Sequence, residues 1–273
     1  MRRARHALRE WPALIARLRR AARLLVLSDL DGTLIPLRAR PDLAVADQKT
    51  RAVLRAVRRA PGVRLGIISG RALCVLRRAV GVRDLVWIGN HGLELGIPGR
   101  TVVVPAARHG TPVMARLARG LAEVVRPIPG ALVEDKGCSL SVHWRNVRPG
   151  AVRSFRRLVY GALEPWQARG GVRVTLGKRV IEVRPPVAWD KGSAVEWLRR
   201  RGRYRAGELV YLGDDRTDED AFRAVNRWHG ISVCVGVRAR VSCARWRLGG
   251  PREALELLER IAEERWKSHR QRS

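Results

Sequence analysis

Short runs of apolar residues alternate with stretches of helical period along most of the chain. The runs that we expect to be buried strands are 24–27, 65–68, 85–88, 209–212 and, more weakly, 231–235. The stretches that we expect to be helices are 46–59, 72–80, 193–201, 218–225 and 252–266. Because continuously apolar strands alternate with helices, the pattern predicts an α/β protein whose parallel sheet is covered on both faces.

The middle of the chain departs from this alternation and predicts a second module. Between about Pro105 and Pro185 the pattern indicates a helix, two strands, a second helix and two more strands. The helices are expected at 113–125 and 151–166, and the strands at 131–133, 139–143, 172–176 and 180–183. We predict an antiparallel α+β domain, residues 105–185, inserted into a core domain formed by 24–104 and 186–273.

The first 23 residues stand apart because they carry eight Arg. They could be a targeting segment, a membrane-surface helix or a solvated first helix. The nearest apolar stretch, Leu24 to Leu27, is too short for a signal-peptide core or a membrane span, and no Ser precedes Ser28. We therefore expect residues 1–23 to form a solvated helix, and we expect no membrane span.

Composition narrows the class of protein further. With 273 residues, 46% of them hydrophobic, the chain can bury a substantial core. Its four Cys form no CxxC pair, so we expect neither a disulfide framework nor a zinc site. Because reduced Cys are typical of the cytosol, we expect a cytoplasmic location. The formal net charge is +30, but the Arg residues are spread along the whole chain. Without a basic stripe or a nucleic-acid motif, we expect no specific nucleic-acid binding.

Four of the predicted strands end in polar loops that contain Gly. These loops begin at Ser28, Ser69, Gly89 and Gly213. In an open parallel sheet the ligand binds beyond the carboxyl ends of the strands, so the four loops should converge at one edge. Three of them carry groups suited to a phosphate or a metal, which makes this edge the candidate site.

The loop after the first strand carries a candidate nucleophile. The carboxylate of Asp29 could attack phosphorus and divide the slow hydrolysis of a phosphate ester into two easier steps. Asp31 could protonate the leaving alkoxide and later activate water, while Gly32 allows a close turn and Thr33 adds a hydroxyl. The alternative is a plain turn or a calcium loop, but the residues after Thr33 lack the further oxygen ligands that a calcium loop needs.

Two further segments offer ligands for a phosphate. The Ser69 hydroxyl and the Gly70 amide could hold phosphate oxygens, although Ser69 could equally cap a helix. Lys191 lies at a predicted helix start, where a cation and free backbone N–H groups both favour an anion. A Lys at such a position can also be merely solvated.

The densest acidic cluster of the chain follows the strand 209–212. Its five carboxylates belong to Asp214, Asp215, Asp218, Glu219 and Asp220. Such a cluster favours a divalent cation, and Mg²⁺ commonly takes one or two carboxylates together with substrate phosphate. Residues 218–220 also fit a helix N-terminus that is stabilised by its dipole, whereas Asp214 precedes that helix and is the best-placed ligand.

Together these motifs resemble the haloacid dehalogenase superfamily of aspartyl phosphatases and, within it, the trehalose-6-phosphate phosphatase family. The segments that carry the closer resemblance are Gly89-Asn90-His91-Gly92-Leu93-Glu94, Glu134-Asp135-Lys136, His143-Trp144-Arg145, Glu182-Val183-Arg184-Pro185, Lys191-Gly192-Ser193-Ala194 and the run from Tyr211 to Phe222. The resemblance extends over about residues 24–258. This sequence differs from the family pattern at Trp144, where Tyr is usual.

The resemblance implies a Rossmann-like core of the haloacid dehalogenase type, with residues 105–185 as a cap domain. It implies that Asp29 is nucleophile and Mg²⁺ ligand, and that Asp31 is general acid/base and a ligand through its carbonyl. Asp214 would complete the metal site. The implied residues that support the metal site are Asp215 and Asp218. The implied phosphate-binding residues are Thr33, Ser69, Gly70 and Lys191. The implied sugar-binding residues are His91, Glu134, Lys136, His143, Arg145 and Glu182.

The activity implied by the resemblance is the last step of trehalose biosynthesis, in which trehalose 6-phosphate is hydrolysed to trehalose and phosphate. We expect a monomer whose sugar-phosphate substrate comes from a synthase on a separate chain. Two alternatives remain open. One is a phosphatase of the same superfamily that acts on another sugar phosphate, and the other is a basic binding protein with an inactive phosphatase fold.

Overall fold

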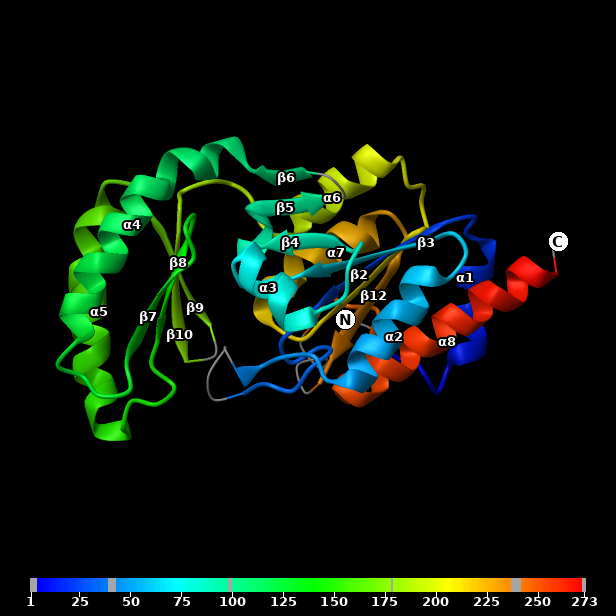
Figure 1. Ribbon diagram of the computed structural model, residues 1–273, viewed down its shortest axis with the longest axis horizontal. Coiled ribbons are helices and arrows are strands. Elements are labelled where there is room, and N and C mark those ends of the chain that lie inside the picture. The colour runs from blue at the N-terminus through cyan, green and yellow to red at the C-terminus, as the bar shows by residue number, and fades with distance from the viewer. Residues whose placement is uncertain (1–3, 39–42, 98–99, 178, 237–241, 272–273) are drawn as a thin grey trace. The chain divides into compact units, whose positions relative to one another are not determined.

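The computed structural model describes residues 4–38, 43–97, 100–177, 179–236 and 242–271. The chain divides into two compact units, Met1–Val102 with Trp189–Ser273, and Val103–Ala188. The first sheet and its helices (Figure 1) are β1 (Arg5–His6), α1 (Trp11–Arg20), β2 (Leu24–Asp29), α2 (Gln48–Arg59), β3 (Val63–Ile68), α3 (Leu73–Val80), β4 (Val86–Gly89), β5 (Glu94–Ile97), β6 (Arg100–Val103), α6 (Lys191–Gly202), β11 (Leu209–Gly213), α7 (Glu219–Arg227), β12 (Ile231–Val235), β13 (Trp246–Leu248) and α8 (Pro251–Arg270). The second sheet and its helices are α4 (Pro105–Val125), β7 (Leu132–Asp135), β8 (Leu140–His143), α5 (Val152–Ala168), β9 (Arg173–Gly177) and β10 (Val180–Arg184).

The first sheet is mixed rather than wholly parallel. Within the described residues, nine strands follow the order β1-β13-β12-β11-β2-β3-β4-β5-β6. In this order, every neighbouring pair from β1 through β13, β12, β11, β2 and β3 to β4 runs parallel. The next pair, β4 and β5, is antiparallel. The α/β class with a mostly parallel sheet is confirmed, and β5, a strand that the sequence did not predict, pairs antiparallel with β4. A parallel crossover needs a dozen or more residues, and only Asn90 to Leu93 separate β4 from β5.

The first sheet is covered on both faces because its central strands are apolar on both sides. On β2, Leu24 and Val26 belong to one hydrophobic core, whereas Leu25 and Leu27 belong to the other. Residues of α1, α2, α3 and α8 close the first core, and residues of α6 and α7 close the second. These two layers fix the carboxyl ends of the strands, where the polar loops begin.

The Arg-rich N-terminal segment contributes β1 and α1. The expected helix is present, but the expectation that it is simply solvated is wrong for one of its faces. Leu14, Ile15 and Leu18 are buried in the core. These apolar residues recur at helical spacing, so they form one stripe that packs inward while the Arg residues of α1 cover the other side.

The second sheet is antiparallel, and the described part of it has the order β7-β8-β10-β9. Leu140, Val142 and Ile181 lie in the core that this sheet forms with α4 and α5. Because side chains alternate along a strand, Ser141 and Glu182 point to the face that these helices do not cover. One face of this sheet is therefore apolar and the other polar.

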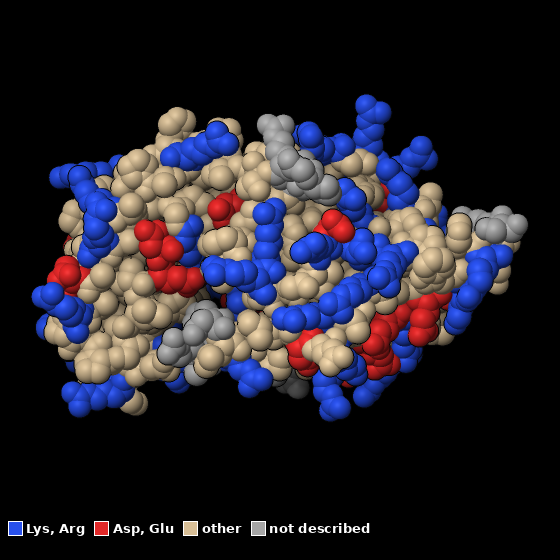
Figure 2. All heavy atoms as spheres, viewed as in Figure 1, with Lys and Arg blue, Asp and Glu red and all other residues tan. Residues whose placement is uncertain are grey.

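The positive charge is distributed widely over the surface. Figure 2 shows Lys and Arg side chains scattered over the visible face rather than gathered in one stripe. Among the described residues, no helix has the length and apolar character needed to cross a membrane.

Candidate active site

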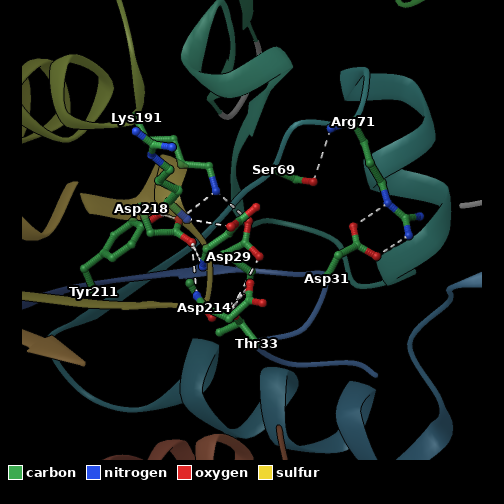
Figure 3. A network of polar contacts seen from close by, with 12 residues as sticks. Asp29, Asp31, Thr33, Ser69, Arg71, Lys191, Tyr211, Asp214 and Asp218 are labelled. Carbon is green, nitrogen blue, oxygen red and sulfur yellow. Dashed lines mark hydrogen bonds and ion pairs between the residues drawn. The ribbon is translucent and has the colours of Figure 1, made fainter. Parts of the chain in front are cut away.

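The polar loops that follow four strands meet at one edge of the first sheet. The strands β11, β2, β3 and β4 are consecutive neighbours and run parallel, so their carboxyl ends lie side by side. Asp29 ends β2, Ser69 follows β3, and Asp214 follows β11. Figure 3 shows these residues around a network of polar contacts that also includes Lys191.

Asp29 and Lys191 form a buried ion pair. The Asp29 side chain is 8% exposed, and its Oδ1 accepts a hydrogen bond from Lys191 Nζ at 2.7 Å. Lys191 points inward from the first turn of α6, which begins after Asp190 caps the Ser193 amide at 2.8 Å. Only 3% of the Lys191 side chain is exposed, so the alternative of a merely solvated Lys is wrong.

Asp218 organises this network. Its Oδ1 accepts hydrogen bonds from Lys191 Nζ at 2.7 Å and from the Tyr211 hydroxyl at 2.6 Å. Its Oδ2 accepts the backbone amides of Asp214 at 3.0 Å and Asp215 at 2.9 Å. A carboxylate has about four acceptor positions, so Asp218 is fully used in fixing the loop after β11. It is suited to supporting a metal site rather than to binding a metal directly.

The charges of this cluster depend strongly on one another. Burial raises the pKa of Asp29 well above its usual range, and the nearby carboxylates of Asp218 and Asp214 raise it further against the opposing charge of Lys191. Burial alone would lower the pKa of Lys191, but Asp218 and Asp29 outweigh it and raise the pKa. The acidic side chains of Asp29, Asp214 and Asp218 share one ammonium group, so a cation placed among them would favour their ionised forms.

The carboxylates fit a hard divalent cation. Oxygen atoms of Asp29, Asp214 and Asp218 all lie within 4.8 Å of one another. The Thr33 hydroxyl lies 3.4 Å from both Asp29 Oδ2 and Asp214 Oδ1 and so sits between the two proposed ligands. Gly32 is required here, because a Cβ at its left-handed backbone (φ +88°) would meet Asp214 Oδ2 at 2.3 Å. An all-oxygen donor set suits Mg²⁺.

Asp31 is held by Arg71, a residue to which the sequence assigned no role. Arg71 donates from Nε and from Nη2 to the two Asp31 oxygens at 2.7 and 2.6 Å. Figure 3 shows the Asp31 carboxylate turned toward Arg71 rather than toward Asp29. The signal was present in the sequence, since Arg71 directly follows Ser69 and Gly70 in the loop after β3.

Ser69 does not cap the helix that follows it. The N-cap of α3 is Ala72, whereas Ser69 Oγ accepts the Arg71 amide at 3.2 Å within the loop. This arrangement leaves the Ser69 hydroxyl proton to donate to a ligand. Gly70 lies against His91, because a Cβ at Gly70 would be 2.5 Å from the imidazole ring. The structure thus brings Ser69, Gly70 and His91 together.

The second unit contains a separate polar cluster on the face of its sheet that α4 and α5 do not cover. Glu134 Oε2 lies 2.8 Å from His143 Nε2, and Lys136 Nζ lies 3.4 Å from Glu182 Oε2. Ser141, which the sequence did not single out, donates to Glu182 at 2.8 Å. The structure therefore brings together four of the implied sugar-binding residues. Another, Arg145, lies in the turn after β8.

The sequence matches the family model for trehalose-phosphatase over residues 27–248. The chain belongs to the trehalose-phosphatase family. This confirms the resemblance to trehalose-phosphatases, which are phosphoric monoester hydrolases. The fold is also similar to that of a phosphatase of the HAD superfamily from Bacteroides thetaiotaomicron, with a TM-score of 0.54 at 17% identity.

Relatives of this trehalose-phosphatase family member are found in plants, bacteria and fungi. It is 34% identical to the probable trehalose-phosphate phosphatase 4 of Oryza sativa subsp. japonica, over 93% of this chain and 69% of that protein. It is 38% identical to the trehalose-phosphate phosphatase of Mycobacterium avium, over 88% of this chain and 62% of that protein. The C-terminal domain of trehalose-6-phosphate phosphatase from C. albicans superposes with a TM-score of 0.82 at 25% identity, covering 96% of this chain and 98% of that one.

Proposed function

We propose that this protein hydrolyses trehalose 6-phosphate to trehalose and phosphate, with Asp29 as the nucleophile. The observation that carries the mechanism is the position of Asp29 at the end of β2, where its carboxylate pairs with Lys191 and lies beside Asp214. The family and the relatives support the substrate.

In the first step, an Asp29 oxygen attacks phosphorus and the bond from phosphorus to the sugar oxygen breaks. Asp31 gives a proton to that leaving oxygen, which departs as a hydroxyl of trehalose. The product on the enzyme is an aspartyl phosphate. Before it can act, Asp31 turns from Arg71 toward the leaving oxygen, which makes Arg71 the residue that holds it between turnovers.

In the second step, Asp31 takes a proton from water as the water oxygen attacks phosphorus. The bond from phosphorus to Asp29 breaks, and inorganic phosphate leaves. Lys191, Thr33, Ser69 and the Gly70 amide orient the phosphoryl oxygens and offset their charge. A Mg²⁺ ion, which Asp29, the Asp31 carbonyl and Asp214 would hold, supplies further positive charge toward the phosphoryl group.

The polar cluster of the second unit is proposed to recognise the sugar. Sugar hydroxyls both donate and accept hydrogen bonds, so a surface that alternates carboxylates with cations can match their pattern. Glu134 and Glu182 supply acceptors, and Lys136 supplies donors between them. A sugar with a different hydroxyl pattern would leave some of these groups unmatched, which is a strong basis for rejection.

The direct test is a panel of sugar phosphates assayed with Mg²⁺. Phosphate release from trehalose 6-phosphate should be much faster than from sucrose 6-phosphate or glucose 6-phosphate, and a chelator should abolish it. Equal rates on all three esters would contradict the proposed substrate but leave the phosphatase chemistry intact. Salt-sensitive retention of nucleic acid without any phosphatase activity would instead support a binding protein.

A further inference from the structure

The loop after β3 and the loop after β4 are joined by several backbone hydrogen bonds. The amide of Asn90 donates to the Arg71 carbonyl at 2.8 Å, and the amide of His91 donates to the Ser69 carbonyl at 3.0 Å. The amide of Ser69 in turn donates to the Ile88 carbonyl at 2.9 Å. The positions of Ser69 and His91 are therefore set jointly by the two loops.

This junction includes two consecutive residues in an uncommon backbone conformation. Asn90 and His91 are consecutive and both have left-handed conformations, with φ of +47° and +56°. Residues other than Gly seldom adopt such a conformation unless the surrounding contacts enforce it. We therefore expect contacts from neighbouring residues to hold residues 90 and 91 in this conformation.

Glu94, on β5, makes the contacts that can do so. Its Oε2 accepts a hydrogen bond from Asn90 Nδ2 at 2.7 Å and another from the Leu73 amide at 2.8 Å. Leu73 is the first residue of α3, and the N-cap residue Ala72 makes no side-chain cap. One carboxylate oxygen thus replaces the missing cap of α3 and at the same time fixes the loop after β4.

The pairing of β4 with β5 places Glu94 close to the start of α3. Gly89 lies directly opposite Glu94 in the antiparallel pair of β4 and β5. A Cβ at Gly89 would meet the Leu73 amide nitrogen at 2.8 Å, and the Arg71 carbonyl and Glu94 Oε2 at 3.0 Å each. The start of α3, the end of β4 and the Glu94 carboxylate are in close contact only because residue 89 is Gly.

We propose that Glu94 is a positioning residue for phosphate binding. It joins the loop that carries Ser69, Gly70 and Arg71 to the loop that carries His91, and so fixes the groups that face the phosphoryl site. This inference rests on the proposed phosphatase function, but not on the identity of the sugar. Glu94 itself need not touch the substrate.

The test compares Glu94→Ala with Asp47→Ala. Each change removes a carboxylate that accepts an amide in the first turn of a helix, since Asp47 accepts the Thr50 amide of α2 at 2.8 Å. Hydrolysis of p-nitrophenyl phosphate and inhibition by inorganic phosphate are measured for both variants, each at a temperature where it is folded. Because small displacements of binding groups are costly, Glu94→Ala should lower kcat/KM by about 100-fold. It should also weaken inhibition by phosphate, whereas Asp47→Ala should change neither value.

Two further variants guard against a simple folding defect. Glu94→Gln keeps an amide oxygen that can accept both hydrogen bonds, so activity and phosphate inhibition should return close to those of the parent. Asn90→Gly removes the side-chain contact with Glu94, but Gly suits the left-handed backbone. This variant should therefore fold, and it should bind phosphate more weakly than the parent. Faster hydrogen exchange of the Leu73 amide in Glu94→Ala is expected independently of activity.

Unchanged phosphate inhibition in Glu94→Ala and Asn90→Gly would overturn the proposal, as would equal losses in Glu94→Ala and Asp47→Ala. A parent protein that hydrolyses p-nitrophenyl phosphate but not trehalose 6-phosphate would contradict only the proposed substrate. A parent without any phosphatase activity would contradict the proposed function. Phosphate binding and the exchange of the Leu73 amide would then still decide whether Glu94 positions the two loops.

Discussion

The two carboxylate clusters of this protein differ in where the fold places them and in how their charge is balanced. Asp29 and Asp218 lie beyond the carboxyl ends of neighbouring parallel strands, are almost wholly buried, and share the ammonium group of Lys191. Glu134 and Glu182 lie on the polar face of an antiparallel sheet, and their side chains are partly buried, 25% and 12% exposed. The first arrangement suits chemistry at fixed atoms, and the second suits recognition of a polar surface.

The difference follows from the two kinds of sheet. Parallel strands bring the loops at their ends to a common edge, where few side chains can be fixed by many backbone amides. Asp218 is an example, since it accepts hydrogen bonds from two backbone amides and from the side chains of Lys191 and Tyr211. An antiparallel sheet with one covered face instead presents alternate residues of each strand as a flat polar surface. Substitutions in the first cluster should therefore affect all substrates, and those in the second only substrates with the right sugar.

The largest effect is expected from Asp29→Asn. The amide is nearly the same size as the carboxylate but is a poor nucleophile, so kcat should fall by at least about 10⁴-fold, the scale of loss found when a covalent nucleophile is removed. The loss should be equal for trehalose 6-phosphate and p-nitrophenyl phosphate. Asp84→Asn, at a side chain that is 73% exposed, is the matched control and should retain full activity. Substantial turnover by Asp29→Asn would refute the proposed nucleophile.

Removal of Lys191 should cost both activity and stability. In Lys191→Met the buried carboxylates of Asp29 and Asp218 lose their counter-charge, and breaking a buried pair in this way typically destabilises a protein by about 3–5 kcal/mol. Urea denaturation should show this loss. The double variant Lys191→Met/Asp29→Asn should recover part of it, because one of the two uncompensated charges is then gone. A double variant less stable than Lys191→Met would contradict the ion pair.

Glu182→Gln should separate the two clusters most clearly. It removes the carboxylate that faces Lys136 and accepts the Ser141 hydroxyl. Since a hydrogen bond to a charged group contributes about 1.5–3 kcal/mol, kcat/KM for trehalose 6-phosphate should fall by about 10- to 100-fold. The value for p-nitrophenyl phosphate should stay close to that of the parent. Glu123→Gln, at an exposed site on α4, is the control, and equal losses on both substrates would exclude a role for Glu182 in sugar recognition.

Much of the fold could be predicted because apolar periodicity reports burial directly. The strands β2, β3, β11 and β12 each contain a mostly apolar run, and the predicted ranges fall within the observed ones. The sequence did not predict β1 and β13. These strands have two and three residues, which is too short to show a periodic pattern of apolar residues. The start of α4 was also missed, because Gly110 and Pro112 lie inside the helix and interrupt its pattern.

The site could be predicted where a motif follows a strand, and not where a side chain arrives from elsewhere. Asp29, Asp214 and Lys191 each lie at an element boundary that the sequence marks. Tyr211 lies within a buried strand, where an aromatic residue indicates core, yet its hydroxyl reaches Asp218. Glu94 reaches α3 from 21 residues away, and only the pairing of β4 with β5 brings it there.

The smallest predicted effect concerns the pH dependence of the second cluster. Burial alone would raise the pKa of Glu134, but its hydrogen bond with His143 and the charge of Lys136 outweigh burial and hold the pKa below the usual 4.5. A carboxyl with a lowered pKa in the folded state stabilises the protein above the unfolded pKa, and this contribution disappears as the pH falls through the folded pKa.

The difference in unfolding free energy between the parent and Glu134→Gln should therefore be largest above the unfolded-state pKa of 4.5 and shrink as the pH falls through the lower folded-state pKa. Other acidic groups, such as Glu196 with its pKa of about 2, are shared by both proteins and cancel in the difference. Because the pair is partly exposed, the change should stay within about 1 kcal/mol. The measurement is urea denaturation of both proteins across that pH range. A difference that is constant with pH would mean that Glu134 gains nothing from His143 and Lys136 in the folded state, and the second cluster would then lack the charge coupling that defines the first.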